Sequence, residues 1–165
     1  MIASQNRHGA IVKPLVAGGA NMEAMNKHGL TSLMIASEDG HEAMIKALIE
    51  SGANVNAIDR DGWASLFYAS GSGCEMVVKV LIENGAYVDV RNRCGSTPLS
   101  WASQHGHEAV VKVLIGAGAD ISARNKNGFT PLLWALVNRR EVVVKLLVNH
   151  GALVNDGAGV SLGTD

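Results

Sequence analysis

The sequence predicts an all-α solenoid, a stack of helical units joined by turns and β-hairpin fingers. A Gly-Ala dipeptide recurs every 33 residues along the 165-residue chain, at Gly19-Ala20, Gly52-Ala53, Gly85-Ala86, Gly118-Ala119 and Gly151-Ala152. A second glycine series keeps the same period, at Gly29, Gly62, Gly95 and Gly128. A fixed period of this length is typical of repeat architectures, in which each unit buries its apolar face against its neighbours.

Residues 92–124 show which elements one unit contains. Thr97 followed by Pro98 predicts the N-cap and first position of a short helix, and Gly106 predicts its end. Residues 108–115 carry apolar side chains at helical spacing, which predicts a second helix with Gly118 just after its C-terminus. Residues 119–128 indicate an extended turn or hairpin. Each unit is therefore expected to be helix, turn, helix and hairpin.

The composition excludes several classes of protein. Fourteen Lys and Arg against fifteen Asp and Glu give a formal charge of −1, too balanced to favour nucleic acid as a partner. No apolar run approaches the roughly 18 residues of a membrane span, and residues 1–13 lack the order of a signal peptide. Cys74 and Cys94 are too few for a disulfide framework or zinc module. We therefore expect free thiols and an intracellular, cytoplasmic location, with the nucleus left open.

The unit resembles the ankyrin repeat, whose pattern runs Asp-x-x-Gly-x-Thr-Pro-Leu-His-x-Ala-Ala-x-x-Gly-His, then an apolar helix, then Gly-Ala-Asp-Val-Asn-Ala. Residues 92–107 and 118–123 match it nearly throughout. The Thr-Pro-Leu-x-Trp-Ala variant at Trp101 and Trp134 resembles ankyrin arrays of fungal proteins. The resemblance implies a truncated first repeat at 1–25, repeats at 26–58, 59–91, 92–124 and 125–157, and a flexible tail at 158–165.

Departures from that pattern predict local differences. Four other residues stand at the motif histidine, Met34, Phe67, Ser100 and Leu133, so the hydrogen bonds of that histidine to the backbone are expected to be lost. Arg139-Arg140 replaces Gly-His, which predicts a positive φ at Arg139, a cost of about 1 kcal/mol and the loosest repeat. Residues 1–4 align with residues 34–37, so the chain is expected to begin inside a helix and to leave an end open to self-association.

Residues at one position of the repeat form rows along the stack, spaced by roughly 10 Å. On the second helices a lysine follows a glutamate by four residues in four units: Glu42 and Lys46, Glu75 and Lys79, Glu108 and Lys112, Glu141 and Lys145. This order predicts a solvated convex face with helical ion pairs, and we place no site there.

The hairpin tips carry a cation in four consecutive units, at Lys27, Arg60, Arg93 and Lys126. This row either attracts an acidic partner surface or forms ordinary solvated tips, partly neutralised by Asp59 and Asp61. Two neighbouring positions vary between units and are candidates for specificity: His28, Asp61, Cys94 and Asn127, then Leu30, Trp63, Ser96 and Phe129. Trp63 and Phe129 are large enough to anchor an interface.

The first helices carry another aromatic row, Tyr68, Trp101 and Trp134. These rings either form the floor of a concave groove or fill the space between inner and outer helices. The polar residues expected nearest to such a floor are Glu38, Asp39, Gln104, His105 and Asn138.

Motifs for chemistry are sparse. His41, Cys74 and His107 share one repeat position, but roughly 10 Å between units is too far for a common metal. Hydrogen bonding at the second-helix N-termini is expected of them instead. No phosphate loop, zinc-protease helix or nucleophile elbow is present in the sequence. His105, with Trp101 one turn earlier and Asp39 or Asp61 in the same groove, is the one acid/base arrangement considered.

Two hypotheses follow. The first is a non-enzymatic protein-interaction module, without cofactor or metal, that binds a protein partner on the concave surface of hairpin tips and inner helices. The second is an enzyme or small-molecule binder that uses the groove of Tyr68, Trp101 and Trp134 with His105 as acid/base. An enclosed pocket around these rings favours the second hypothesis, whereas an open surface favours the first.

Overall fold

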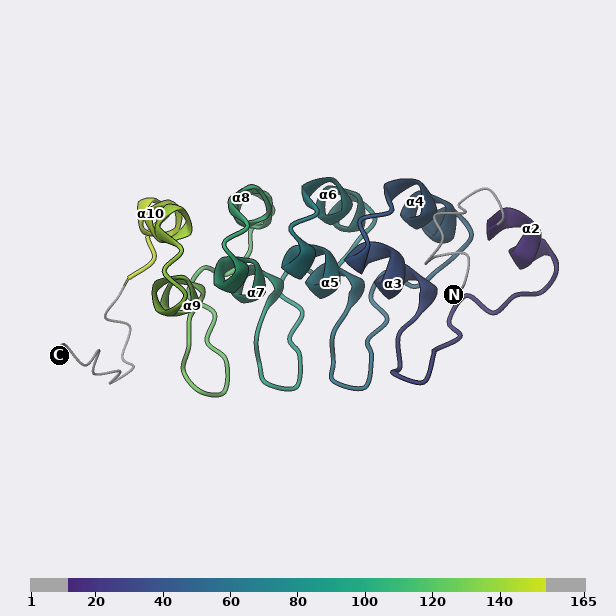
Figure 1. Ribbon diagram of the computed structural model, residues 1–165, viewed down its shortest axis with the longest axis horizontal. Coiled ribbons are helices and arrows are strands. Elements are labelled where there is room, and N and C mark those ends of the chain that lie inside the picture. The colour runs from purple at the N-terminus through teal and green to yellow at the C-terminus, as the bar shows by residue number, and fades with distance from the viewer. Residues whose placement is uncertain (1–11, 154–165) are drawn as a thin grey trace.

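The computed structural model describes residues 12–153 as a stack of helices with loops projecting from one side (Figure 1). The helices of this range are α2 (Val12–Ala17), α3 (Ser32–Glu38), α4 (Glu42–Glu50), α5 (Ser65–Ser72), α6 (Glu75–Glu83), α7 (Pro98–His105), α8 (Glu108–Gly116), α9 (Pro131–Val137) and α10 (Glu141–Asn149). Over the same residues the β-structure is one isolated antiparallel bridge, between Ile58 and Ala64. The predicted all-α repeat stack is confirmed.

The helices form two rows (Figure 1). The inner row is α3, α5, α7 and α9, and the outer row contains α4, α6, α8 and α10. Each inner helix follows a long loop that projects away from the outer row, and we call the loops at 18–31, 51–64, 84–97 and 117–130 the fingers. The extensive helix contacts join helices of one unit or of adjacent units. Side chains at one repeat position therefore line up along the stack.

The predicted helix signals operate as expected at α7. The Thr97 hydroxyl accepts a hydrogen bond from the Ser100 N–H at 3.3 Å, Pro98 occupies the first turn, and Gly106 ends the helix at φ 82°. Because an N-cap oxygen satisfies a backbone donor that the helix leaves unpaired, it stabilises the first turn. Thr31 and Thr130 cap α3 and α9 in the same way.

The expected loss of hydrogen bonds at the motif-histidine position is wrong in two units. The Ser100 hydroxyl accepts from the Thr97 N–H at 3.0 Å and donates to the Thr97 carbonyl at 2.7 Å. In α3 the Met34 sulfur accepts from the Thr31 N–H at 3.4 Å. A small hydroxyl or a polarisable sulfur thus takes over the contact with the backbone.

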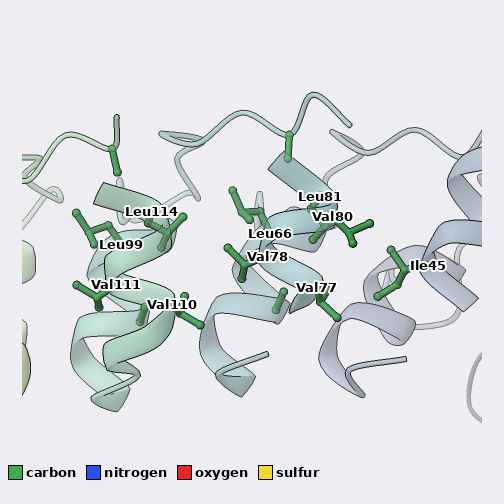
Figure 2. Close-up of a cluster of buried hydrophobic side chains, with 14 of the residues drawn as sticks. Ile45, Leu66, Val77, Val78, Val80, Leu81, Leu99, Val110, Val111 and Leu114 are labelled. Carbon is green, nitrogen blue, oxygen red and sulfur yellow. The ribbon is translucent and has the colours of Figure 1, made fainter. Parts of the chain in front are cut away.

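The core lies between the two rows and repeats with the chain. Each inner helix contributes a leucine and a fully covered alanine, Leu33 with Ala36, Leu66 with Ala69, Leu99 with Ala102 and Leu132 with Ala135. Outer helices add residues such as Ile45, Val78 and Val111. Figure 2 shows Val78 near Leu66 and Val111 near Leu99. Since burying a leucine or valine side chain contributes about 1.5–3 kcal/mol, this shared layer holds adjacent units together.

The outer row is solvated as predicted. Ion pairs form between Lys46 and Glu42, between Lys79 and Glu75, and between Lys112 and Glu108. The expected pair of Glu141 with Lys145 does not form, although both residues are described. No helix within residues 12–153 is long and apolar enough to cross a membrane.

The last repeat carries the predicted strain. Arg139 has φ 55°, and in residues 12–153 it is the one non-glycine residue with positive φ. The equivalent residues are Gly40, Gly73 and Gly106, which adopt this conformation without a steric cost. The helix expected at residues 1–4 and the tail expected at 158–165 lie outside the described residues.

The α5 N-terminus lacks both helix-start residues, and this gives a stability prediction. Ala64 stands at the N-cap with no side-chain hydrogen bond, and the buried Ser65 hydroxyl has no partner. Replacing Ala64→Thr and Ser65→Pro together should raise the free energy of unfolding by about 1–2 kcal/mol, measured by urea denaturation. Thr97→Ala should lower it by about 1 kcal/mol. A destabilised double variant would contradict this account of α5.

Candidate functional site

One polar residue organises each finger, at Asn26, Asp59, Asn92 and Asn125. Its Oδ1 accepts hydrogen bonds from the backbone N–H groups two and four residues later, at 2.8–3.0 Å. Its own N–H donates to the carbonyl of the residue four positions later, at 3.0–3.2 Å. A short amide or carboxylate side chain suits this turn because it satisfies backbone donors that no strand partner reaches.

Neighbouring fingers are also tied to one another. The Arg93 N–H donates to the Asp61 carbonyl, and the Lys126 N–H donates to the Cys94 carbonyl, both at 2.9 Å. The Arg91 guanidinium donates to the carbonyls of Gly95 and Arg124 at 3.0 and 2.8 Å. The finger row is therefore a connected platform.

The four cations of the finger tips are exposed on this platform, as expected. Asp61 lies 3.9 Å from Arg93, and both side chains are more than 70% exposed, so the pair neutralises little. Asp59 instead accepts a hydrogen bond from the Tyr68 hydroxyl at 2.6 Å. Asp61 thus offsets the charge of the basic row only slightly. Asp59 bonds Tyr68 of its own repeat instead of a finger cation.

The aromatic rings of the fingers and inner helices join into one cluster. Trp63 packs edge-on against Trp101 with ring centroids 4.6 Å apart, and against Phe67 at 5.1 Å. Trp101 in turn lies 4.7 Å from His105. Gly71 makes this possible, because a Cβ there would collide with the Trp101 indole nitrogen. The cluster runs from a finger base to the end of an inner helix.

A second ring pair lies in the last repeat, where the Phe129 and Trp134 centroids are 4.9 Å apart. In both clusters the tryptophans are half-buried, as is Phe129. The two alternatives for the aromatic row stay predictions: each of its rings is partly exposed, and its ring contacts are with residues of the fingers and inner helices. We call the exposed and half-buried side chains of the fingers and inner helices the inner surface.

Side chains at the end of each inner helix lock adjacent units together. A Cβ at Gly40, Gly73 or Gly106 would lie 2.6–2.8 Å from the next unit's side chain, respectively Cys74, His107 and Arg140. His107 Nε2 lies 2.7 Å from the Gly71 carbonyl, and Arg140 Nε donates to the Gln104 carbonyl at 3.0 Å. These contacts cross the boundary between repeats.

The expected hydrogen bonds from His41, Cys74 and His107 at their helix N-termini are wrong. None of the three side chains caps its helix. Cys74 and His107 face the preceding unit because its glycine leaves room for them.

The structure places most of the predicted site residues on the inner surface. Those exposed are Lys27, His28, Glu38, Asp39, Arg60, Asp61, Arg93, Cys94, Lys126 and Asn127. Those partly buried are Leu30, Trp63, Tyr68, Trp101, Gln104, His105, Phe129, Trp134 and Asn138. Ser96 is 8% exposed and its N–H donates to Asn92, so it belongs to the turn and not to the inner surface.

The acid/base arrangement considered for His105 is not assembled. His105 Nδ1 lies 2.9 Å from the Trp101 carbonyl. Asp39 and Asp61 belong to units two and one away from it, at a repeat spacing of roughly 10 Å. The open hollows found over residues 12–153, of about 260–630 Å³, lie along the outer helices and the ends of the inner ones, and no tryptophan, tyrosine or phenylalanine lines them.

Tyr68, on α5, and Cys74, at the N-cap of α6, have shifted pKa values. Burial, the hydrogen bond to Asp59 and nearby carboxylates raise the pKa of Tyr68 well above its ordinary value. Burial and the charge of Asp39 raise the pKa of the Cys74 thiol. Both groups are therefore neutral at pH 7.

Sequence reasoning missed residues that organise this surface, although the 33-residue period contains the signal. Asn26, Asp59, Asn92 and Asn125 keep one position in four units, and their shared side-chain oxygen marks the turn. Gly71 stands where other units have Glu38, Gln104 and Val137. That exception marks the space taken by Trp101.

The reactivities of the two free cysteines test the burial of the finger tips and of the inner-helix ends. Cys94 is exposed at a finger tip, and Cys74 is half-buried. A disulfide-exchange reagent should modify Cys94 first, because the raised pKa of Cys74 leaves little thiolate at pH 7. Mass spectrometry of timed samples would follow each site, and raising the pH should accelerate Cys74. Equal rates at pH 7 would contradict the placement.

Comparison with known proteins agrees with this geometry. A family model described as ankyrin repeats, three copies, matches residues 1–92 and 78–158. No curated protein matches the chain.

Proposed function

Because this chain belongs to the ankyrin repeat family, we propose that it is a non-enzymatic protein-interaction module whose inner surface binds a protein partner. The observation that carries the proposal is the combination of an open surface, half-buried rings and a tied row of exposed cations. Aromatic side chains that are held in place and still accessible supply binding energy at small entropic cost.

The charges of the fingers favour an acidic partner. Lys27, Arg60, Arg93 and Lys126 are exposed at the finger tips, and backbone hydrogen bonds join the fingers of the last three. Asp61 offsets only part of that charge. Exposed charges of one sign accelerate encounter with a surface of the opposite sign. An intracellular location belongs to the same proposal, supported by the two free thiols.

The alternative of an enzyme or small-molecule binder has less support. The tryptophans and His105 line none of the hollows described above, whereas small-molecule sites bury most of their ligand. The polar groups considered for catalysis are distributed over different units.

Site-specific photo-crosslinking would test the proposal. A benzophenone side chain placed at Ser72, exposed at the end of α5, should capture a partner from a lysate of the source cells. The matched control is Met76, 54% exposed on α6. A captured protein supports the proposal only if, once purified, it binds the full chain and protects the inner surface. Capture through Met76 alone would contradict it.

The basic row gives a kinetic prediction for such a partner. Reversing Arg60 and Arg93 together to glutamate should slow association and flatten its salt dependence, because these exposed charges act mainly during encounter. Stability should change by less than about 1 kcal/mol, since neither side chain is buried. Stopped-flow association at several salt concentrations measures the effect. An unchanged rate would show that the row plays no part in binding.

Trp101 connects binding with stability. Trp101→Ala should lower the free energy of unfolding by about 2–3 kcal/mol, because the ring packs on Trp63 and His105. It should also raise the dissociation rate of the partner. Trp101→Phe should recover part of the stability and serves as the control. Loss of stability with unchanged dissociation would make Trp101 a core residue only.

A further inference from the structure

The charges along the inner surface are not uniform, and they change sign from one end of the stack to the other. The ends of the inner helices provide the clearest evidence. At two adjacent positions the second repeat carries Glu38 and Asp39, both exposed. The third repeat has Gly71 and Ser72 there, and the fourth has Gln104 and His105. In the last repeat two exposed arginines, Arg139 and Arg140, follow Asn138 in the turn between α9 and α10, at the edge of the inner surface.

The acidic end extends toward the fingers. Glu38 and Asp61 lie close enough to Tyr68 that their charges, with that of Asp59, contribute to the raised pKa of its hydroxyl. Asp59 bonds the Tyr68 hydroxyl directly, at 2.6 Å, and Glu38 and Asp61 act on it through their charges. This end carries Glu38, Asp39, Asp59 and Asp61 in the same two repeats as the finger cations Lys27 and Arg60.

Cations predominate at the other end. The finger cations Arg93 and Lys126 share the last two repeats with Arg139 and Arg140. Asp61 lies 3.9 Å from Arg93, and Glu141 lines one hollow together with Arg139 and Arg140. Arg140 is held in place, because its Nε donates to the Gln104 carbonyl and its chain packs on Gly106. Arg139 keeps a positive φ that glycine adopts in the three preceding repeats. Strained backbone residues occur often at functional sites. The strain at Arg139 is therefore consistent with a role of its charge in binding.

We propose that the inner surface binds its partner segment in one chain orientation and disfavours the reverse orientation. The partner is an extended segment with an acidic block at the end of the stack that carries Arg93 and Lys126, with Arg139 and Arg140 at its edge, and a basic residue or two over Glu38 and Asp39. Between these blocks an apolar side chain packs on the Trp63 and Trp101 rings. This inference rests on the proposed function, and it adds a partner chemistry and an orientation.

The repeat spacing sets the length of that segment. Three repeats separate Asp39 from Arg139, which corresponds to roughly 30 Å at about 10 Å per unit. An extended chain covers about 3.3 Å per residue, so the outer ends of the two charged blocks are separated by about nine residues. A reversed segment would place like charges together, and this repulsion provides the selectivity.

Synthetic peptides test the orientation. The block peptide has four glutamates at one end, two lysines at the other and a central leucine, and the matched control has the same residues in mixed order. The block peptide should bind about two- to fivefold more tightly at low salt, the range expected for exposed charge pairs. A nitroxide on its glutamate end should broaden the amide NMR signals of Gly106 and Gly128 more than that of Gly40. A nitroxide on its lysine end should do the reverse.

Arg139→Gly separates binding from stability. It should weaken block-peptide binding about two- to fivefold while leaving stability equal or higher, because glycine accepts the positive φ. Lys112→Ala, which removes one exposed charge from the outer helix α8, should leave peptide binding unchanged. Glu38→Gln with Asp39→Asn should weaken the block peptide and strengthen an all-acidic peptide.

The outcomes distinguish this inference from the proposed function. Equal binding of the two peptides on the inner surface, or broadening in the opposite order, overturns the orientation and leaves the proposed function standing. Signals that shift only on the outer helices contradict both. If neither peptide binds at millimolar concentration, the inference is overturned and crosslinking at Ser72 decides the proposed function.

Discussion

Packing between adjacent repeats is the interaction on which the rest of the structure depends. No unit has enough apolar surface to form its own core, so each leucine and alanine layer is completed by the next unit. The closest approach is at the ends of the inner helices, where Gly40, Gly73 and Gly106 lie directly beneath side chains of the following repeat. Because these contacts repeat, the units stack at regular intervals. Equivalent exposed positions therefore line up along the stack and form the inner surface.

The sequence was sufficient to predict features that depend on one unit. Thr97, Pro98 and Gly106 determine the ends of α7 through local hydrogen bonds and φ angles, and Arg139 takes the conformation of the glycine that it replaces. Local chemistry of this kind is contained in neighbouring residues, which explains why the pattern was enough.

Features that cross a repeat boundary were harder to predict. His107 was expected to bond its own helix, but it contacts Gly71 of the preceding unit. The Trp63 and Trp101 rings were treated as separate rows, although they meet edge-on across two repeats. Ser96 was expected on the surface and is buried by the turn around Asn92. In each case the contact depends on how the chain folds beyond the local helix signals, and the sequence pattern alone does not give the distance between the two residues.

The same division explains how a constant scaffold carries specific recognition. Residues that maintain the stack, such as the finger residue Asn92 and the covered Ala102, leave neighbouring positions free to vary. Tyr68 illustrates the connection between the two sets, because its hydroxyl requires the acceptor that Asp59 supplies where other fingers have asparagine. Variation at the inner surface is therefore tolerated as long as the contacts between units are retained.

Deleting residues 125–165 tests this dependence on adjacent repeats most directly. The remaining chain keeps the boundaries between its other repeats, so circular dichroism should show a helical protein that unfolds cooperatively at lower urea concentration than the full chain. The amide signals of Gly40 and Gly73 should remain those of the folded state. Complete loss of structure would contradict the account, because it would mean that stability depends on contacts beyond the adjacent repeat.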